Sequence, residues 1–111
     1  MTEKSTKYLS DILMAITLIE EFTIGVTDFK VYDNDRKTQS AVERQLAIIG
    51  EALNQFRKLE PTIEIQNDKQ IIAFRNRLVH AYDSLDNSMI WVIMKKHLKP
   101  LEIEVENLSR R

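Results

Sequence analysis

Helix-breaking residues are scarce in this chain, and this scarcity limits the folds open to it. Among 111 residues there are two glycines and two prolines, while 43% of the residues are hydrophobic and 30% are charged. A sheet of many short strands would need turn-forming residues about every ten positions. We therefore predict an all-α fold, an antiparallel bundle of four to five helices in one domain over residues 1–111.

The spacing of apolar residues divides the chain into helices. We predict helices over about residues 5–25, 35–59, 67–82 and 87–98, and we expect Pro100 to end the last of these. Residues 101–111 fit both the alternation of a strand and the stripe of a helix; we choose a helix, because one strand would have no partner. Residues 26–34 break the helical period, and we expect Phe29, Val31 and Tyr32 to pack on the core as a lid.

Two of these helices indicate contacts with a further helix. Gly50 lies inside the apolar stripe of 35–59, where glycine costs about 1 kcal/mol relative to alanine. We expect the compensation to be a close approach of the helix that follows it. Residues 89–94, which include Trp91, are apolar on every side, as in a helix that is central or shared with a second subunit. Together with the separation of Arg75 and His80 around their helix, described below, the second of these alternatives predicts a homodimer.

Charge and composition exclude several classes of protein. The formal net charge is −1, so any nucleic-acid binding must come from a local cluster of cations. The chain has no cysteine, which excludes disulfides and thiolate chemistry. No apolar run approaches the roughly eighteen residues of a membrane span, and the N-terminus has no apolar signal region. We expect a cytoplasmic protein without membrane association.

Polar residues of catalytic type are concentrated in the segment RNRLVHAY, residues 75–82. On a helix Asn76 and His80 share a face, with Arg77 close to it, whereas Arg75 lies about 140° from His80. Arg75 and His80 could meet at one ligand because arginine is long, or because a second chain brings another copy. Tyr82 can join them if the helix frays.

These residue types suit chemistry on phosphodiesters. A histidine with an ordinary pKa of about 6.5 can accept or donate a proton near neutral pH. The arginine guanidinium matches phosphate oxygens, and asparagine can orient the histidine or the ribose. RNA cleavage by its own 2′-hydroxyl needs only a base, an acid and a cation, so no metal or cofactor is expected. The alternative is a solvated helix face or a satisfied core network.

Residues outside the segment offer weaker candidates. Glu51 is either a surface residue or a partner of Arg75, Arg77 or His80. We interpret His97 as structural, because one histidine without cysteines does not form a metal site. Trp91 is expected in packing rather than in base stacking, and Glu43 and Arg44 as solvated. Exposed cations could form a rim for RNA: Arg36, Lys37, Arg57, Lys58 and Lys69.

The arrangement Arg75, four residues, His80, one residue, Tyr82 resembles the R-x4-H-x-Y motif of HepT-like toxins of the HEPN superfamily. The segments YLSDILMAITLIEEFT and ERQLAIIGEAL, both before the motif, are also similar to that family, so the resemblance covers nearly the whole chain. It implies an all-α homodimer with metal-independent endoribonuclease activity, as the toxin of a type VII-like toxin–antitoxin pair.

The resemblance also implies roles for individual residues. Arg75 and His80 would be catalytic, with Asn76 supporting them, and Tyr82 would receive AMP from a cognate minimal nucleotidyltransferase antitoxin. Arg77 and Glu51 are further supporting candidates on spacing alone. The competing hypothesis is a non-catalytic helical module that binds a nucleotidyltransferase or a nucleotide through the same basic cleft. A purely structural dimer would leave Arg75, Asn76 and His80 unexplained.

Overall fold

The computed structural model describes residues 1–80 and 86–111, with the side chains of all of these except Val79 and His80. Its α-helices are α1 (Glu3–Phe22), α2 (Phe29–Asp33), α3 (Arg36–Leu59), α4 (Lys69–His80), α5 (Asn87–Val92) and α6 (Leu98–Ser109), and the π-helix η2 (Ile93–His97) joins α5 to α6. The described residues contain no strand. The predicted all-α bundle is therefore confirmed.

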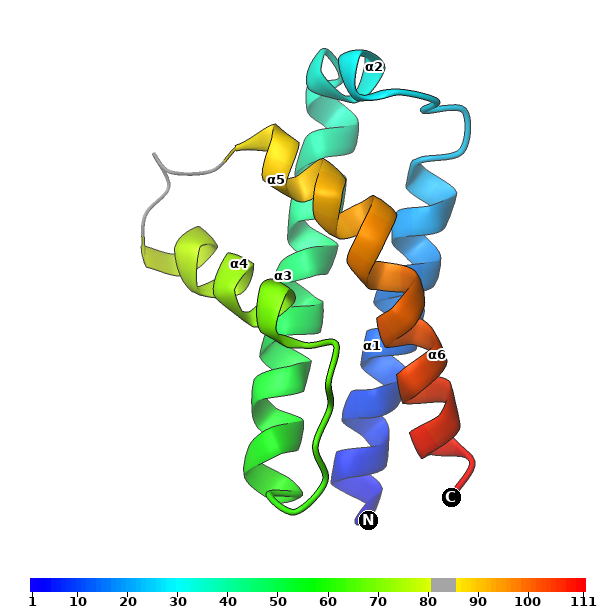
Figure 1. Cartoon of the computed structure of the whole chain (residues 1–111), viewed down its shortest axis with the longest axis vertical. Coiled ribbons are helices and arrows are strands. Elements are labelled where there is room, and N and C mark those ends of the chain that lie inside the picture. The colour runs from blue at the N-terminus through cyan, green and yellow to red at the C-terminus, as the bar shows by residue number, and fades with distance from the viewer. Residues whose placement is uncertain (81–85) are drawn as a thin grey trace.

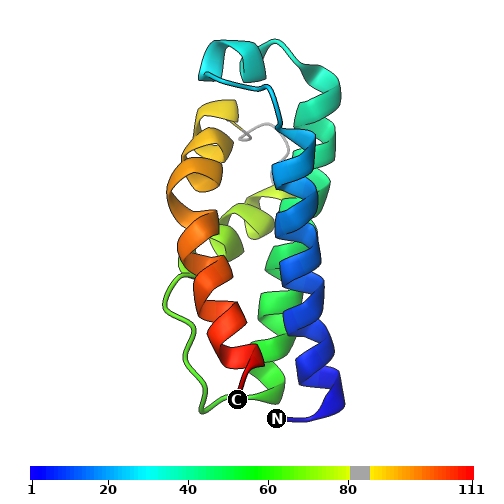
Figure 2. The ribbon, with the colours of Figure 1, turned by 90° about the vertical axis from the view of Figure 1, so that its right-hand side faces the viewer.

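Three long segments run side by side along the molecule. These are α1, α3 and the continuous run α5–η2–α6, and the two termini lie at the same end of the bundle (Figures 1 and 2). α4 crosses α3 instead of running along it, and a long connection joins the two helices (Figure 1). The crossing leaves one side of α4 uncovered by the described helices.

Polar side chains fix where the main helices begin. Thr2 and Ser5 form a capping box at the start of α1, with the Ser5 amide donating to Thr2 Oγ1 over 3.1 Å. Asp35 accepts a hydrogen bond from the Thr38 amide at the start of α3, over 3.0 Å. The predicted boundaries of α3 are thus close to the observed ones, whereas α1 ends at Phe22, before Gly25.

The core is built from the apolar stripes of every helix. α3 supplies one continuous row of buried residues: Val42, Leu46, Ile49, Ala52, Leu53 and Phe56. α1 packs on this row with Leu9, Ile12, Ala15, Ile16 and Ile19. Because α3 touches both α1 and α4, it is the helix that sets the position of α4.

The expected lid is partly wrong. Residues 29–33 form the short helix α2 rather than a loop, because the Asp28 side chain accepts from the Val31 amide and starts a helical turn. Tyr32 is fully buried, and Phe29 and Tyr32 both pack against the ring of Trp91. Val31 is exposed, in contrast to the expectation.

The expected stop at Pro100 is wrong. η2 has π geometry, in which the Leu98 amide donates to the Ile93 carbonyl five residues back. Pro100 therefore lies in the first turn of α6, where a missing N–H and a fixed φ are tolerated, and the helix continues. The choice of a helix for the C-terminal tail is confirmed.

The run from Met89 to Met94 is more exposed than its composition suggests. Ile90 and Ile93 are buried, Trp91 and Met94 are half-buried, and Val92 is exposed. Trp91 packs as expected in the core region, and the Lys95 ammonium lies 4.6 Å from its ring centroid.

Candidate functional site

Gly50 lets α4 approach α3 closely at Arg75. A Cβ atom on Gly50 would lie 2.8 Å from Arg75 Cγ, closer still to Arg75 Cβ, and 3.4 Å from the Ile71 carbonyl oxygen. Real Cβ atoms do not approach other atoms so closely, so only glycine fits here without a shift of α4. The predicted reason for a glycine inside this helix is confirmed.

The close contact brings the Arg75 guanidinium to the next residue of α3. Arg75 Nη2 donates to Glu51 Oε2 over 2.5 Å, and Nη1 donates to Asn76 Oδ1 over 3.3 Å. The Arg75 side chain keeps 24% of its surface exposed, and that of Glu51 keeps 45%. Arg75 is thus held at one edge while donor groups stay open to solvent.

A third residue of α3 holds the carboxylate in turn. Gln55 Nε2 donates to Glu51 Oε1 over 2.9 Å, one helical turn further along. The Gln55 hydrogen bond, and then the charge of Arg75, lower the pKa of Glu51 below its usual range. Glu51 is therefore ionised at neutral pH. Sequence reasoning missed Gln55, although its i,i+4 spacing from Glu51 was a usable signal.

Arg77 lies on the other flank of α4. Its Nη1 is 2.9 Å from the Met89 sulfur on α5, so Glu51 pairs with Arg75 and not with Arg77. Between these flanks Ile71 and Phe74 face the core, and Leu78 is half-buried. The two arginines therefore face different neighbours, although they are two residues apart.

By helical register, position 80 of α4 shares a face with Asn76 and Ala73. It lies four residues after Asn76 and seven after Ala73, and both of these are exposed. His80 is the last residue of α4, and its side chain lies outside the described part of the molecule. Tyr82 also lies outside the described residues, so the predictions for both side chains stay predictions.

Two hollows flank the motif helix. The first, here called the Tyr8 groove, has a volume of about 490 Å³ and lies between α1, α3 and Leu78 of α4. It is lined by Lys7, Tyr8, Asp11, Arg44, Ala47, Ile48, Glu51, Ala52 and Leu78. The second, of about 320 Å³, lies between α4 and the α5–η2 run and includes Arg77, Met89 and His97 in its wall. His97 is thus half-buried beside α4 rather than free in solvent.

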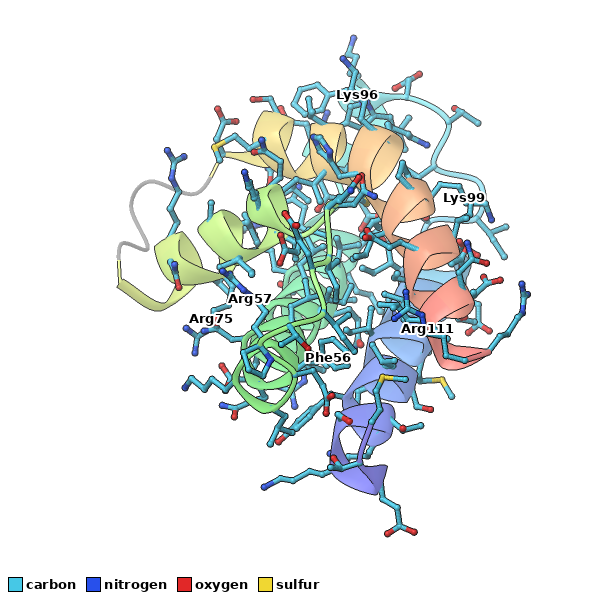
Figure 3. The ribbon with its side chains drawn as sticks, turned by 60° about the horizontal axis from the view of Figure 1, so that its bottom comes forward. Phe56, Arg57, Arg75, Lys96, Lys99 and Arg111 are labelled. Atoms are coloured by element: carbon cyan, nitrogen blue, oxygen red, sulfur yellow. The ribbon has the colours of Figure 1, made fainter. Side chains whose placement is uncertain are left out.

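The expected rim cations are exposed. They are Arg36, Lys37, Arg57, Lys58 and Lys69. Arg57 has a second role, since its Nε lies 4.0 Å from the buried carboxylate of Asp68. Arg57 and Arg75 belong to the α3–α4 side of the molecule, and Lys96 and Lys99 belong to the α5–α6 side (Figure 3).

Two kinds of feature are absent from the described residues. No three histidine, aspartate or glutamate side chains among them are grouped so as to hold a metal ion. Within the same residues, no helix is long and apolar enough to cross a membrane.

Comparison with known proteins gives similarities over nearly the whole chain. The family described as "Ribonuclease HepT-like" matches residues 12–108. The chain is 38% identical, over 99% of its length, to all of a Thermococcus cleftensis protein named "Probable ribonuclease HepT". It is 33% identical, over 96% of its length, to 98% of "Putative RNase MJ1380" of Methanocaldococcus jannaschii. No solved structure matches the chain.

Proposed function

This chain belongs to the HepT-like ribonuclease family, and on that premise we propose that it is a metal-independent endoribonuclease and the toxin of a toxin–antitoxin pair in the cytoplasm. Arg75 and His80 are its catalytic residues. The observation that supports this most directly is the Arg75 guanidinium, held by Glu51 at 2.5 Å and still partly open to solvent. A fixed and accessible arginine is suited to bind a phosphate oxygen.

The proposed reaction is an internal transfer of the phosphodiester. The ribose 2′-oxygen loses its proton to a base and attacks the neighbouring phosphorus atom. The bond from phosphorus to the 5′-oxygen of the next nucleotide breaks, and an acid protonates that oxygen. The products are a 2′,3′-cyclic phosphate and a free 5′-hydroxyl. His80 acts as base or acid, and Arg75 stabilises the charge on the phosphoryl oxygens.

One chain places these two groups poorly for one phosphate. Arg75 lies on the flank of α4 that meets α3, and position 80 lies about 140° further round the helix. We propose that a homodimer joins the uncovered faces of two α4 helices, so that one cleft contains two arginines and two histidines. Asn76 supports the RNA from that face, and Arg77 does so from the flank beside α5. Glu51 supports Arg75.

The proposed control of the toxin acts at Tyr82. A cognate minimal nucleotidyltransferase antitoxin transfers AMP from ATP to the tyrosine hydroxyl, and pyrophosphate leaves. The AMP group brings bulk and negative charge next to Arg75 and His80, so it competes with the RNA phosphate.

The nuclease proposal is tested by incubating purified protein with cellular RNA in excess chelator. The chain has two histidines, which gives a matched pair of variants. His80→Ala should abolish cleavage, and His97→Ala should retain it. Cleavage that persists in His80→Ala rejects the assigned role. No cleavage by wild-type protein of unmodified mass favours the non-catalytic binding module instead.

Two further measurements test the dimer and the modification. Light scattering should give the mass of a dimer at micromolar concentration, and a stable monomer would count against the shared cleft. Intact mass after incubation with antitoxin and ATP should show AMP adducts on wild type and on Tyr8→Phe, and none on Tyr82→Phe. Adducts that persist on Tyr82→Phe would reject the site.

A further inference from the structure

The Tyr8 groove begins at the residue that holds Arg75. Glu51 lies in its wall and pairs with Arg75, and Leu78 closes the groove from α4, one turn after Arg75. Arg44 lies seven residues before Glu51 on α3, about two helical turns away. A strand bound with a phosphate at Arg75 can therefore continue along α3 through this groove.

The lining of the groove carries two cations and two carboxylates, and the ion pairs leave one of these cations, Arg44, without a carboxylate of that lining. Lys7 Nζ lies 3.0 Å from Asp11 Oδ2, and Glu51 is paired with Arg75. Both carboxylates of the groove are thus neutralised by cations of their own. Arg44 is exposed and has no ion-pair partner among the described residues, so its guanidinium is available to an anion.

An aromatic ring lies in the same groove. Tyr8 is half-buried, and the Lys7 ammonium lies 5.1 Å from its ring centroid. Its neighbours in the groove include the small or aliphatic side chains of Ala47 and Ile48. Aromatic rings beside cations are the usual elements of surfaces that bind single-stranded nucleic acid, because any base can stack on a ring.

We propose that the Tyr8 groove binds a nucleotide of single-stranded RNA adjacent to the one cut at Arg75, with its base against Tyr8 and its phosphate on Arg44. The proposed site rests on the proposed nuclease function. It implies that the substrate of the nuclease is single-stranded RNA. The cation Arg44, unpaired among the described residues, favours a polyanion over the apolar face of a second copy, because the centres of interfaces between copies are depleted of charge.

The test measures binding separately from cleavage. All variants are made in the His80→Ala protein, and a fluorescent single-stranded RNA of mixed sequence is titrated at several salt concentrations. Arg44→Ala should weaken binding roughly fivefold and reduce the slope of log K against log salt by about 0.7, the value for one phosphate contact. Lys96→Ala removes the same charge from the α5–α6 side (Figure 3) and should leave the slope unchanged.

The base contact is tested with two variants of Tyr8. Tyr8→Ala should weaken RNA binding roughly five- to hundredfold, whereas Tyr8→Phe keeps the ring and should bind nearly as wild type. Circular dichroism reports whether Tyr8→Ala still folds; if it does not, the affinity and salt slope of Arg44→Ala alone decide whether the groove binds RNA.

Several outcomes would overturn the proposal. One is an equal change of slope in Arg44→Ala and Lys96→Ala, and another is unchanged affinity in a folded Tyr8→Ala. A fall in molar mass of the folded Tyr8→Ala or Arg44→Ala protein would assign the groove to contact between copies. Wild-type protein that binds RNA through this groove without cutting it would reject the nuclease and leave the groove site in place.

Discussion

Arg75 and Glu51 form an ion pair of 2.5 Å between two crossing helices, and the residue next to Glu51 is a glycine whose missing side chain makes room for Arg75. The same two neighbouring residues of α3 thus provide both the space for the arginine and its partner. An arginine that is fixed before substrate arrives loses less conformational freedom on binding a phosphate. Substitutions of Gly50 or Glu51 should therefore affect RNA cleavage by displacing Arg75.

Gly50→Ala should reduce RNA cleavage while the protein still folds. The added methyl would lie 2.8 Å from Arg75 Cγ, so α4 must shift relative to α3. Overpacking lowers the free energy of unfolding by about 1–3 kcal/mol, and the better helix propensity of alanine offsets at most about 1 kcal/mol of this loss. Thermal unfolding and cleavage are measured together, with the exposed Ser40→Ala of the same helix as control. Unchanged activity and stability would contradict the tight contact.

Glu51→Ala should lower kcat/KM for RNA by roughly tenfold, because Arg75 loses the group that orients it. Gln55→Ala should have a smaller effect in the same direction, since Gln55 acts on Arg75 only through Glu51. Cleavage assays on both variants give the comparison. If Glu51→Ala instead raised activity, the carboxylate would be a competitor of the RNA phosphate rather than its support.

Asp68 should make the protein less stable as the pH rises. Burial raises the pKa of Asp68 above its ordinary 3.8, so the folded state binds the proton more tightly than the unfolded state. Its contribution to stability is therefore present below pH 3.8 and is lost as the pH rises through the raised value. Thermal unfolding is measured between pH 3 and 7. The unfolding temperature of Asp68→Asn should rise relative to that of wild type across this range.

Asp35 gives the control of opposite sign. Its hydrogen bonds with Thr38 lower its pKa, so its stabilisation is present above pH 3.8 and is lost as the pH falls through the lowered value. The free energy of unfolding of Asp35→Asn should therefore fall relative to that of wild type as the pH rises. The same trend for both variants would contradict the assignment for Asp68.

Tyr32→Phe should stabilise the protein by about 1 kcal/mol. The Tyr32 side chain is fully buried, and its hydroxyl has no hydrogen-bond partner among the described residues. Burial also raises the pKa of Tyr32, so the group stays neutral and its cost is that of an unpaired hydroxyl. Chemical denaturation compares this variant with the half-buried Tyr8→Phe, which should be neutral. A loss of stability in Tyr32→Phe would indicate a hydrogen bond to this hydroxyl.

Some features of this protein could be predicted from local sequence. The apolar stripes of α1 and α3 repeat over many turns, so the helices and most of their boundaries followed from spacing. Gly50 could be interpreted correctly because glycine weakens the interior of a helix, and a close contact with a neighbouring helix offsets that cost. The choice of a helix for residues 101–111 followed from the lack of a partner for a strand.

Other features were decided by tertiary contacts. The helix continues through Pro100 because the preceding π turn places this proline in the first turn of α6. No residue pattern before Pro100 predicts that π turn. Val31 and Tyr32 are adjacent in sequence, yet only Tyr32 of the two is buried, and its ring packs against Trp91.

The sequence by itself determined that Arg75, Asn76 and His80 lie on a helix and how far apart they lie around it. It did not determine that Glu51 pairs with Arg75 rather than Arg77, because both arginines are within the reach of a carboxylate on a crossing helix. The pairing depends on the side of α4 that turns toward α3, and this is fixed by the packing of Ile71 and Phe74 into the core and by the close contact at Gly50. Helical periodicity is a local property of the chain, whereas the rotation of one helix against another is set by side chains distant in sequence.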